Sequence, residues 1–521
     1  MNEFNEFLKE NRKFWSQFEI KNKGKKLLIE EPGRIMIIHR SAIFAMIINQ
    51  ARGYTPAWLC KKDCSEYQLL QSYFPDVEIV TTRNKSLPRE LRKLRAIVIA
   101  LLKFLEIYFT KDILGFHYDG VRYGDIVYDA YLYENQVATI KKIDFKIFKI
   151  IALCIFRHLK IKNILQNENY AGVLVSHQQG IYSGVMLRSA LRYGYEGYLH
   201  TGHYQATLRC FKSLKEIEDP YKPSQSDILQ IIDQLGPRLK DVFWEVFKKE
   251  VAGKGSSDGL NAFSKNNRYY TNRTSFNEDN KLSLNKKNVF IMLHVFNDWP
   301  HSTFRWIIFK DYYDWFIQTL EFAKKNNKVN WIFKQHPSIK WYPTKDVSYN
   351  KLFSECPDNI VYIDENKQID TRSLINCADL IITCIGSAGF ELPAMEAIPS
   401  ITAGDNYSAG LGFALEPKTK EEYFEILDRV DKIEKLTPQA REMAQAVYVF
   451  VYRFSRINIS ICPMLSYDQE KDENISSWYW KEVARLYREK KDVFLRETKS
   501  YIKDVSRAHF ERLNNFKKDQ L

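Results

Sequence analysis

The stretch from Asp379 to Ile401, DLIITCIGSAGFELPAMEAIPSI, constrains the fold more than any other part of the sequence. Its apolar run Leu380 to Thr383 predicts a buried parallel strand, and the small residues Gly386 to Gly389 predict a tight turn. A helix over Phe390 to Ala397 and a further strand over 400–402 follow. A chain that alternates strands and helices in this way is expected to fold as an α/β protein with a parallel sheet.

The turn between this strand and helix is typical of an anion site. Backbone N–H groups and the positive end of the helix dipole face the space beyond the strand, which favours a bound phosphate. The cradle would consist of Gly386, Ser387, Ala388 and Gly389, and Glu391 and Glu396 would accept hydrogen bonds from sugar hydroxyls. An ordinary strand-to-helix turn has the same pattern, so the turn alone leaves both interpretations open.

A second apolar strand brings a histidine to the same edge of the predicted sheet. Residues 331–334 end in Gln335-His336-Pro337, and the carboxyl ends of parallel strands are where open α/β sheets bind ligands. An imidazole there can bind a nucleotide phosphate and stabilise it as it leaves. A lone histidine is more often structural. Its combination with the downstream turn favours the functional interpretation.

Taken together, these pieces resemble the donor half of GT-B glycosyltransferases. The resemblance rests on Lys334-Gln335-His336-Pro337, an Ala-Asp-Leu-Ile-Ile-Thr strand, the turn Gly386 to Glu391, and Pro399. The nearest match is the bacterial capsule and surface polysaccharide biosynthesis group, which includes Kdo transferases with a His-Pro motif. The resemblance implies two Rossmann-like domains facing across a cleft. It also implies a nucleotide-sugar donor on the second domain, and an acceptor and catalytic base on the first.

The resemblance makes CMP-Kdo a reasonable donor, with lipopolysaccharide or capsule polysaccharide as the product class. UDP- and GDP-sugars stay open, because Gln335 precedes the His-Pro step and no second serine adjoins Ser387. Imidazole, backbone amides and cationic side chains can meet the charge of the leaving group, so no metal and no separate cofactor is expected beside the nucleotide sugar. The loop from Gly404 to Gly410, with Tyr407, would close on the donor as a flexible segment.

Two aspartates in the amino-terminal half are the candidates for the catalytic base. The stretch from Gly115 to Tyr133 is rich in Gly, Tyr and Asp and is interpreted as a loop lining the cleft. Asp119, and after it Asp125, would act as a general base toward the acceptor hydroxyl, or as a nucleophile if the reaction retains configuration. Asp-Gly is also a common turn dipeptide, so plain turn chemistry is the competing interpretation.

A further buried strand, residues 171–176, ends at polar residues suited to acceptor or phosphate contacts. These candidates for acceptor binding are His177, Gln178, Tyr182, Arg188 and His203. The first four lie at or just beyond the carboxyl end of a predicted parallel strand. The histidines lack the helical spacing and the neighbouring carboxylates of a metal site, so no metal is predicted here either.

With 521 residues the chain is too long for one ordinary core. Residues 252–286 are the stretch most like a linker, so we place the boundary between the two domains there. We therefore predict an acceptor domain over 1–270 and a nucleotide-sugar domain over 285–430. Residues 431–521 are expected to form helices that cross back toward the first domain, followed by a basic tail.

The charge and cysteine pattern bear on where the protein works. The formal net charge is +13, and the eight cysteines are scattered, with only Cys60 and Cys64 close together, which favours reduced thiols in the cytoplasm. Two basic, apolar helices are predicted, over 87–110 and 145–165. Each would either lie in an anionic membrane interface or pack on the sheet. The amino terminus lacks the apolar core of a secretory signal.

The sequence therefore predicts a cytoplasmic glycosyltransferase, peripheral at the inner face of the cytoplasmic membrane. It would add a sugar to a surface polysaccharide or a lipid-linked glycan. A polyol-phosphate transferase of the teichoic-acid type and a sugar-nucleotide epimerase are the alternative enzymes. A nonenzymatic basic module that binds membrane or nucleic acid is the alternative from another class. Nucleic acid is not an expected partner, because the positive charge is spread over helices rather than gathered in an aromatic-rich recognition motif.

Overall fold

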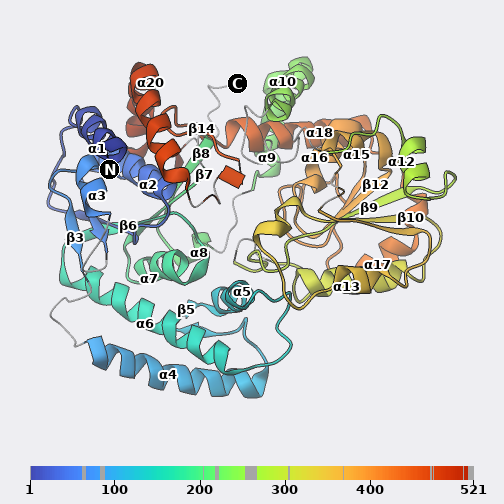
Figure 1. Cartoon of the computed structure of the whole chain (residues 1–521), viewed down its shortest axis with the longest axis horizontal. Coiled ribbons are helices and arrows are strands. Elements are labelled where there is room, and N and C mark those ends of the chain that lie inside the picture. Colours follow the sequence, from blue (N-terminus) through green and yellow to red (C-terminus); the bar gives the residue numbers. More distant parts are fainter. Residues whose placement is uncertain are drawn as a thin grey trace. The chain divides into compact units, whose positions relative to one another are not determined.

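A computed structural model of the chain divides into two compact units. It describes residues 2–60, 66–81, 89–202, 205–217, 222–252, 267–302, 306–365, 367, 369–466, 468–469, 472, 474–508 and 510–513. The first unit comprises Met1–Tyr131, Lys142–Asp219 and Ser455–Asn515, and the second Leu132–Lys141, Pro220–Phe454 and Phe516–Leu521. The chain thus leaves the first unit and returns to it at Ser455 (Figure 1).

The first unit is built on an eight-stranded sheet with a parallel centre. Its strands are β1 (Lys26–Ile29), β2 (Thr55–Leu59), β3 (Glu78–Val80), β6 (Tyr170–Val175), β7 (Glu196–Gly202), β8 (Gln205–Phe211), β14 (Ile457–Asn458) and β15 (Arg512–Leu513). The order is β14-β8-β7-β6-β1-β2-β3, with β15 also on β8. Strands β7 to β3 along this order pair in parallel, whereas β8 is antiparallel to β7, β14 and β15. The returning chain therefore completes the sheet of the first unit.

Helices cover both faces of this sheet. The helices of this part of the chain are α1 (Asn2–Trp15), α2 (Ile35–Arg52), α3 (Tyr67–Tyr73), α4 (Arg89–Thr110), α6 (Phe145–Asn167), α7 (Val185–Arg192), α8 (Leu214–Ile217) and α20 (Ile475–Val505), and α4 packs on α6 rather than on the sheet. Helix α2 is apolar on all sides, which is the pattern of a fully buried helix, and it packs between the sheet and α20. Residues of α6 and α7 form the core on the opposite face.

The segment predicted as a cleft loop, Gly115 to Tyr133, has regular structure instead. A hairpin of β4 (His117–Tyr118) and β5 (Val121–Arg122) is followed by helix α5 (Gly124–Asn135). The prediction of a loop is wrong because Ile126, Val127 and Leu132 are fully buried and pull the segment into a helix. The Gly-Asp step is the first turn of that helix rather than a surface turn.

The second unit contains a fully parallel five-stranded sheet. Its strands are β9 (Asn288–Met292), β10 (Asn330–Lys334), β11 (Ile360–Ile363), β12 (Leu380–Thr383) and β13 (Ser400–Thr402), in the order β11-β10-β9-β12-β13. Numbered along the chain, this order is 3-2-1-4-5, and the parallel strands of the first sheet follow the same order. That is the strand order of the Rossmann fold. The predicted α/β class with two Rossmann-like domains and a helical carboxyl-terminal segment is confirmed.

Two hydrophobic cores cover the faces of the second sheet. The helices are α9 (Gln225–Leu235), α10 (Leu239–Val251), α12 (Arg273–Asp279), α13 (Tyr312–Ala323), α14 (Tyr349–Phe353), α15 (Thr371–Cys377), α16 (Ala388–Glu396), α17 (Lys420–Asp428) and α18 (Pro438–Val449). Phe243 of α10 meets Tyr448 of α18 with ring centroids 5.0 Å apart. Residues 225–251, expected in the first domain, therefore belong to the second unit because their apolar faces pack there.

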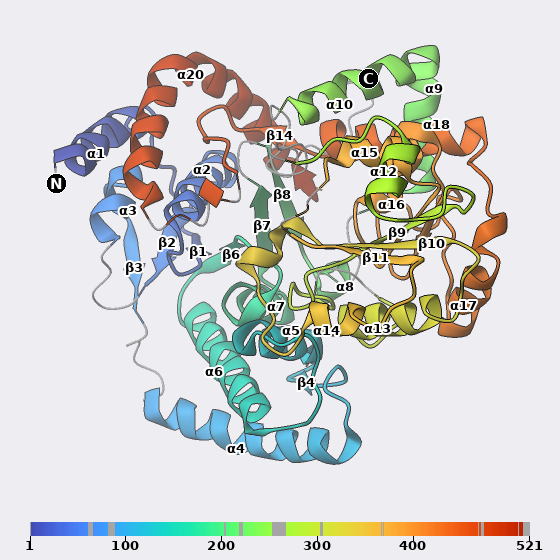
Figure 2. The ribbon, with the colours of Figure 1, turned by 45° about the vertical axis from the view of Figure 1, so that its right-hand side comes forward.

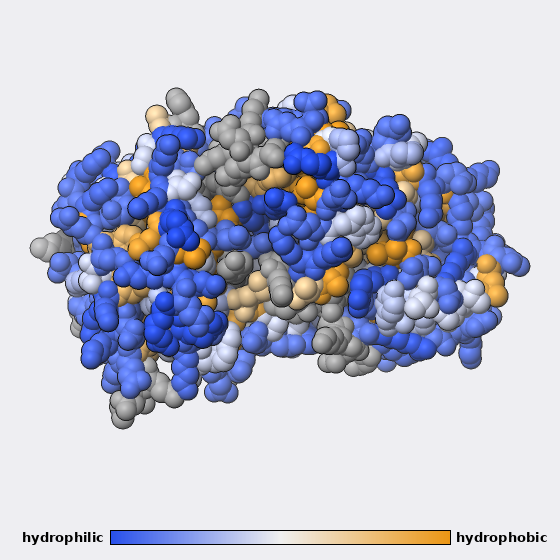
Figure 3. Space-filling view, turned by 90° about the horizontal axis from the view of Figure 1, so that it is seen from above, coloured by the Kyte–Doolittle hydropathy of each residue, from blue (hydrophilic) through white to orange (hydrophobic). Residues whose placement is uncertain are grey.

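The surface and the cysteines complete the description. On the face drawn in Figure 3, hydrophobic residues occur in small groups among hydrophilic ones. Cys154, Cys210, Cys356, Cys377, Cys384 and Cys462 are free, whereas Cys60 is disulfide-bonded. The prediction of reduced thiols is therefore wrong for Cys60. No helix in the described part of the chain is long and apolar enough to span a membrane.

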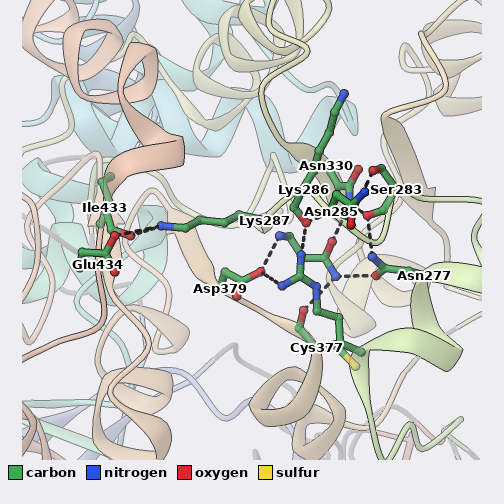
Figure 4. A network of polar contacts seen from close by, with 12 residues as sticks. Asn277, Ser283, Asn285, Lys286, Lys287, Asn330, Cys377, Asp379, Ile433 and Glu434 are labelled. Atoms are coloured by element: carbon green, nitrogen blue, oxygen red, sulfur yellow. Dashed lines mark hydrogen bonds and ion pairs between the residues drawn. The ribbon is translucent and has the colours of Figure 1, made fainter.

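The amino edge of the second sheet is held by a buried asparagine network (Figure 4). Asn288 opens β9 and donates to Asn277 Oδ1 at 2.7 Å and to the Cys377 carbonyl at 3.0 Å. Asn330 opens β10 and donates to Asn288 Oδ1 at 2.8 Å. Both asparagines are fully buried. Because the network occupies the amino edge, it fixes the strands without reaching their carboxyl ends.

Replacing Asn288 by Ala should lower the unfolding free energy by about 2–4 kcal/mol, because the truncation leaves buried partners without hydrogen bonds. Urea unfolding would measure the loss. Asn285→Ala is the matched control, since Asn285 lies in the same network view but is exposed, and its midpoint should stay near wild type. Equal urea midpoints for wild type and Asn288→Ala would contradict the stabilising role of the asparagine network.

Candidate functional site

Each sheet has a topological switch point, where the strand order reverses: between β1 and β6 in the first unit, and between β9 and β12 in the second. Open α/β sheets bind ligands beyond the carboxyl ends of the strands at such points. The residues that follow β1, β6, β9 and β12 are therefore the candidates for function. Two of them, Glu30 and His294, were not singled out by the sequence patterns.

His294 joins the two strands at the switch point of the second unit. Its Nε2 accepts the backbone N–H of Ile385 at 3.1 Å and lies 3.2 Å from Thr383 Oγ1. The Thr383 hydroxyl oxygen in turn accepts the backbone N–H of Gly386 at 3.0 Å. The loop after β9 thus fixes the start of the glycine turn after β12, and the turn is rigidly shaped before any ligand arrives.

The His294 imidazole is neutral. Burial, with a smaller contribution from the nearby His336, lowers its pKa to about 3. The ring also stacks on Tyr312, with centroids 4.3 Å apart and planes 17° apart. Because Nε2 accepts a backbone hydrogen bond, the ring proton resides on Nδ1. His294 therefore orients the turn at every pH near neutrality.

His336 stands at the end of the neighbouring strand β10. It caps a short 3₁₀ helix, η3 (Pro337–Trp341), and its Nδ1 accepts the Ser338 N–H at 3.1 Å. Because β10 pairs in parallel with β9, His336 and His294 both lie beyond the carboxyl edge of the same sheet. The structure thus brings together the histidine and the glycine turn that the sequence patterns selected separately. His294 is the link between them.

The two residues before His336 are more enclosed than the histidine itself. Lys334 and Gln335 are buried, and Pro337 is half-buried at the first position of η3. Burial lowers the pKa of Lys334 to about 8. A lysine with this pKa is mostly charged at pH 7 but loses its charge more readily than an ordinary lysine, and a nearby phosphate would favour the charged form.

The glycine turn leads directly into helix α16, which begins at Ala388. Ser387 stands at the cap position, but its side chain makes no capping hydrogen bond. A Cβ on Gly389 would lie 2.8 Å from Asn406 Nδ2 and 3.0 Å from Thr402 Cγ2, so only glycine fits there. The N–H groups of the first turn, with the helix dipole behind them, are oriented to bind an anion.

Three buried polar atoms at the end of β13 and in the loop after it lack a hydrogen-bond partner: Thr402 Oγ1, Asp405 Oδ2 and Asn406 Nδ2. Their residues are at most 1% exposed, and buried polar groups are nearly always satisfied. Asn406 also borders Gly389 of the turn, and the other Asp405 oxygen pairs with Lys222. The polar character of this corner favours a ligand that carries hydrogen-bonding groups.

The remaining predicted donor residues lie at different distances from the turn. Glu391, in the first turn of α16, accepts a hydrogen bond from Tyr452. Glu396 ends the same helix, about 13 Å along its axis from Ser387. It approaches Arg441 at 3.8 Å, so the helix geometry separates Glu396 from the cradle.

The loop that carries Tyr407 is packed rather than flexible. Asp405, Asn406 and Ser408 are buried, and the Ser408 N–H binds Asn406 Oδ1 at 2.8 Å. Tyr407 meets Phe390 edge to face, with centroids 5.7 Å apart. The expectation of a flexible closing loop is therefore wrong, because burial and internal hydrogen bonds hold the loop against α16.

At the switch point of the first unit, Glu30 follows β1. Its Oε1 accepts the Ser176 N–H at 2.6 Å, and its Oε2 accepts the Ser183 hydroxyl. Burial raises the pKa of Glu30 and outweighs these hydrogen bonds, which act in the opposite direction. Ser183 belongs to a π-helical turn, η1 (Gly180–Gly184), a feature frequent at functional sites.

Three predicted acceptor residues lie at this same edge. His177, Gln178 and Tyr182 follow β6, and Ser176 Oγ lies 2.8 Å from His177 Nδ1. The Tyr182 side chain is 62% exposed, and its carbonyl accepts a hydrogen bond from buried Arg157 at 3.2 Å. His203 lies outside the described residues. The edge thus offers an imidazole, amides and a phenol beside a buried carboxyl group.

Beside Glu30, Glu31 has the opposite electrostatic setting. Burial alone would raise its pKa, but Arg157 and Lys160, the latter 2.8 Å away, lower it to about 2. Two consecutive glutamates therefore differ in protonation, one held as a carboxylate and the other shifted toward the acid.

The two predicted aspartate bases are engaged in structural contacts. Asp125 pairs with Arg188 through both oxygens, at 2.7 and 2.6 Å, and both side chains are buried. Despite burial, Arg188 lowers the pKa of Asp125. This geometry favours a structural role over the base and acceptor roles predicted for the pair.

Asp119 has a left-handed backbone, with φ 51°, in the hairpin turn. Its Oδ2 accepts from Tyr193 and lies 3.2 Å from His158 Nε2, and these hydrogen bonds lower its pKa against the effect of burial. Tyr193 follows α7 shortly before β7 begins, so Asp119 lies toward the amino edge of the sheet, opposite Glu30. Turn chemistry, the competing interpretation, accounts for this residue.

No known protein-family profile and no curated protein matches the sequence. Solved structures with partial similarity include a glycosyltransferase from Rickettsia africae ESF-5, with 12% identity, covering 91% of this chain and 99% of that one at a TM-score of 0.29. UDP-GlcNAc 2-epimerase from Neisseria meningitidis bound to UDP-GlcNAc has 10% identity, coverages of 82% and 98%, and a TM-score of 0.25. Acinetobacter baumannii MurG has 10% identity, coverages of 91% and 99%, and a TM-score of 0.21. Similarities this weak carry no argument about function.

Among the described residues, no three His, Cys, Asp or Glu side chains are grouped to hold a metal ion.

The opposite shifts of Glu30 and Glu31 predict opposite pH dependences of stability. A glutamate whose pKa is higher in the folded state than in the unfolded state contributes stability that is fully present below the unfolded pKa. This contribution is lost as pH rises, so wild type should lose stability relative to Glu30→Gln above about pH 4.5. The loss should be at most about 1.4 kcal/mol per pH unit. Denaturant unfolding from pH 4 to 8 would measure it.

Glu31→Gln is the matched control with the opposite sign. The pKa of about 2 means that the wild-type advantage is present above the unfolded pKa and is lost as pH falls toward 2. If the unfolding free energies of both variants changed with pH in the same direction relative to wild type, the environments assigned to Glu30 and Glu31 would be contradicted.

Proposed function

We propose that the protein is a glycosyltransferase that moves a sugar from a nucleotide-sugar donor to a surface polysaccharide or a lipid-linked glycan. One observation carries the proposal: the capless amino terminus of α16 opens at the switch point between β9 and β12, with His294 fixing its turn and His336 beside it. In this proposal the donor phosphate binds at the turn from Gly386 to Gly389 through the backbone N–H groups of Ser387 and Ala388, because those of Gly386 and Gly389 donate to Thr383 Oγ1 and to the Gly386 carbonyl.

The chemistry of the turn supports phosphate binding. The amino end of α16 carries a partial positive charge and N–H groups that no side chain caps. A phosphate there would receive hydrogen bonds from fixed donors, which stabilise charge that develops on the leaving nucleotide. Ser387 would add a hydroxyl, and the unpartnered Asn406 amide would donate to a sugar or phosphate oxygen.

His336 is the proposed electrophilic group. Its Nδ1 accepts the Ser338 N–H, so the neutral ring carries its proton on Nε2, where it can donate to a phosphate oxygen. Lys334, with its pKa near 8, would become fully charged as the phosphate approaches. The nucleotide sugar is the co-substrate in this proposal.

For the transfer step we assign the general base to Glu30. A glutamate whose pKa is raised toward neutrality suits proton abstraction from an acceptor hydroxyl. His177, Gln178 and Tyr182 would contact the acceptor. Asp119 and Asp125 are weaker candidates for this role because their pKa values are lowered.

The proposal also names candidate nucleotide-sugar donors. CMP-Kdo is the first candidate, and UDP- and GDP-sugars are the others. A lipid-linked or surface glycan as acceptor would require work at the inner face of a membrane. A polyol-phosphate transferase could use the same phosphate site, and it is distinguished by the donor that it accepts.

A panel of nucleotide donors tests the proposal. CMP-Kdo, UDP-sugars, GDP-sugars and CDP-polyols would be assayed for thermal stabilisation and donor hydrolysis. A donor at a hundred times its Kd should stabilise the fold by about 2.7 kcal/mol. Stabilisation by a sugar nucleotide supports glycosyl transfer, whereas turnover of a CDP-polyol alone supports the alternative. Binding to DNA or vesicles without any nucleotide effect would favour a nonenzymatic module.

His336→Ala should lower kcat by about 10²–10³-fold, because one donor to the leaving phosphate is lost. Steady-state kinetics with the donor found in the panel would measure the change. His117→Ala is the control, since His117 is an exposed histidine of the β4-β5 hairpin in the first unit. Turnover within about twofold of wild type in His336→Ala would refute the role.

A further inference from the structure

Helix α4 presents its bulky apolar residues to solvent. Of the twenty large hydrophobic residues that are exposed in the described chain, nine lie on this one helix. They are Leu91, Leu94, Ile97, Val98, Leu101, Leu102, Leu105, Tyr108 and Phe109, between 43% and 78% exposed. The stripe is about 27 Å long. Isolated exposed hydrophobics are ordinary, but a continuous stripe of this length marks an interaction surface.

The packing of α4 is the reverse of that expected for a helix on a globular protein. The buried residues of α4 are Arg92, Ala96, Ala100 and Ile107, and the helix packs against α6. Figures 1 and 2 show α4 running along α6 at the margin of the first unit. The larger aliphatic side chains point the other way. The interpretation that this helix packs its apolar face on the sheet is therefore wrong.

Helix α6, unlike α4, packs apolar residues on the sheet of the first unit. Eleven of its residues are buried, and three of them, Ile161, Ile164 and Leu165, form core with the sheet and α7. Its amino-terminal end extends the exposed surface: Phe145 is 61% exposed and stacks on Phe148, which meets Phe104 of α4 edge to face. The exposed apolar surface thus belongs to α4 and the first turn of α6.

Basic side chains border this surface. Helices α4 and α6 together carry ten Lys and Arg against two Glu. Lys93, Arg95, Lys146 and Lys149 are exposed or half-buried near the stripe, and the Lys111 ammonium lies 4.1 Å from the centre of the Tyr108 ring. An apolar face between cationic side chains matches a surface that is apolar within and anionic outside.

A second copy of the chain fits this surface less well. The positions Leu91, Leu94, Val98, Leu101, Leu105 and Tyr108 follow coiled-coil spacing, but Ile97, Leu102 and Phe109 widen the stripe beyond a two-residue seam. Pairing α4 with itself would also bring basic side chains of the same sign together. Both the width and the charge favour a lipid interface.

We infer that the outward face of α4 docks into the interface of an anionic bilayer. The helix lies in the membrane plane, its leucines and Phe109 among the acyl chains and its lysines and Arg95 near the headgroups. The inference does not depend on the proposed transfer reaction, because it rests on the surface of the first unit alone.

Sedimentation with phosphatidylcholine vesicles, with and without phosphatidylglycerol, tests the inference on the full chain. Wild type should bind the anionic vesicles, and more weakly as salt rises. The triple variant Leu94→Gln, Leu101→Gln, Leu105→Gln should bind about tenfold more weakly or worse, with an unchanged melting temperature because these side chains are exposed.

The matched control changes three exposed leucines of the second unit in the same way: Leu229→Gln, Leu284→Gln and Leu415→Gln. It should bind vesicles like wild type. No binding by wild type, or equal binding by both triple variants, would overturn the inference. A wild-type dimer that the α4 variant abolishes, without any vesicle binding, would assign the face to a second copy instead.

A fluorescent reporter locates the contact. Phe109→Trp places an indole at the most exposed position of the stripe, 78% exposed in the present side chain. Anionic vesicles should shift its emission to shorter wavelength relative to wild type carrying only its native tryptophans. An unshifted emission while the protein is bound would show that another surface holds the membrane.

Discussion

The hydrogen bond from the Ile385 N–H to His294 Nε2 is the contact on which the second unit's site depends. It ties the loop after β9 to the turn after β12, the two strands that flank the switch point. The first hydrogen bond fixes the turn, and the second, from Gly386 to Thr383, sets its entry into α16. Because His294 stays neutral, this geometry does not change with pH near neutrality.

The two units use the same strand order for different chemistry. Order 3-2-1-4-5 brings the ends of the first and fourth strands together in each sheet. In the second unit these ends carry N–H groups and imidazoles, which suit an anion. In the first unit they carry Glu30, buried and shifted toward the acid, beside His177. One unit thus offers groups that hold a phosphate, and the other a group that can move a proton.

Sequence patterns anticipated the local structure around the second candidate site better than that around the first. The apolar strands and the small-residue turn around Gly386 are local features, so their positions could be read directly from the residues. His294 has no such signature. It follows a strand in a polar loop, and only the pairing of β9 with β12 shows that it faces the turn. Glu30 was missed for the same reason, although its place directly after a predicted strand was a usable signal.

Long-range packing explains the other differences between the sequence-based predictions and the structure. Asp119 and Asp125 have the sequence context of catalytic carboxylates, but Tyr193 and Arg188, which engage them, lie more than sixty residues away. The domain limits depend on α9 and α10, whose apolar faces meet α18 about two hundred residues later. The outward orientation of the bulky apolar side chains of α4 could likewise be recognised only in the structure, since amphipathic spacing alone does not say which face of a helix is covered.

Hydrogen–deuterium exchange with and without nucleotide sugar tests the central claim most directly. The account predicts slower exchange of the backbone amides from Cys384 to Phe390 and of the segments around His294 and His336, with little change at the asparagine network of the amino edge. Protection confined to other segments, despite saturating donor, would contradict a phosphate site at this turn.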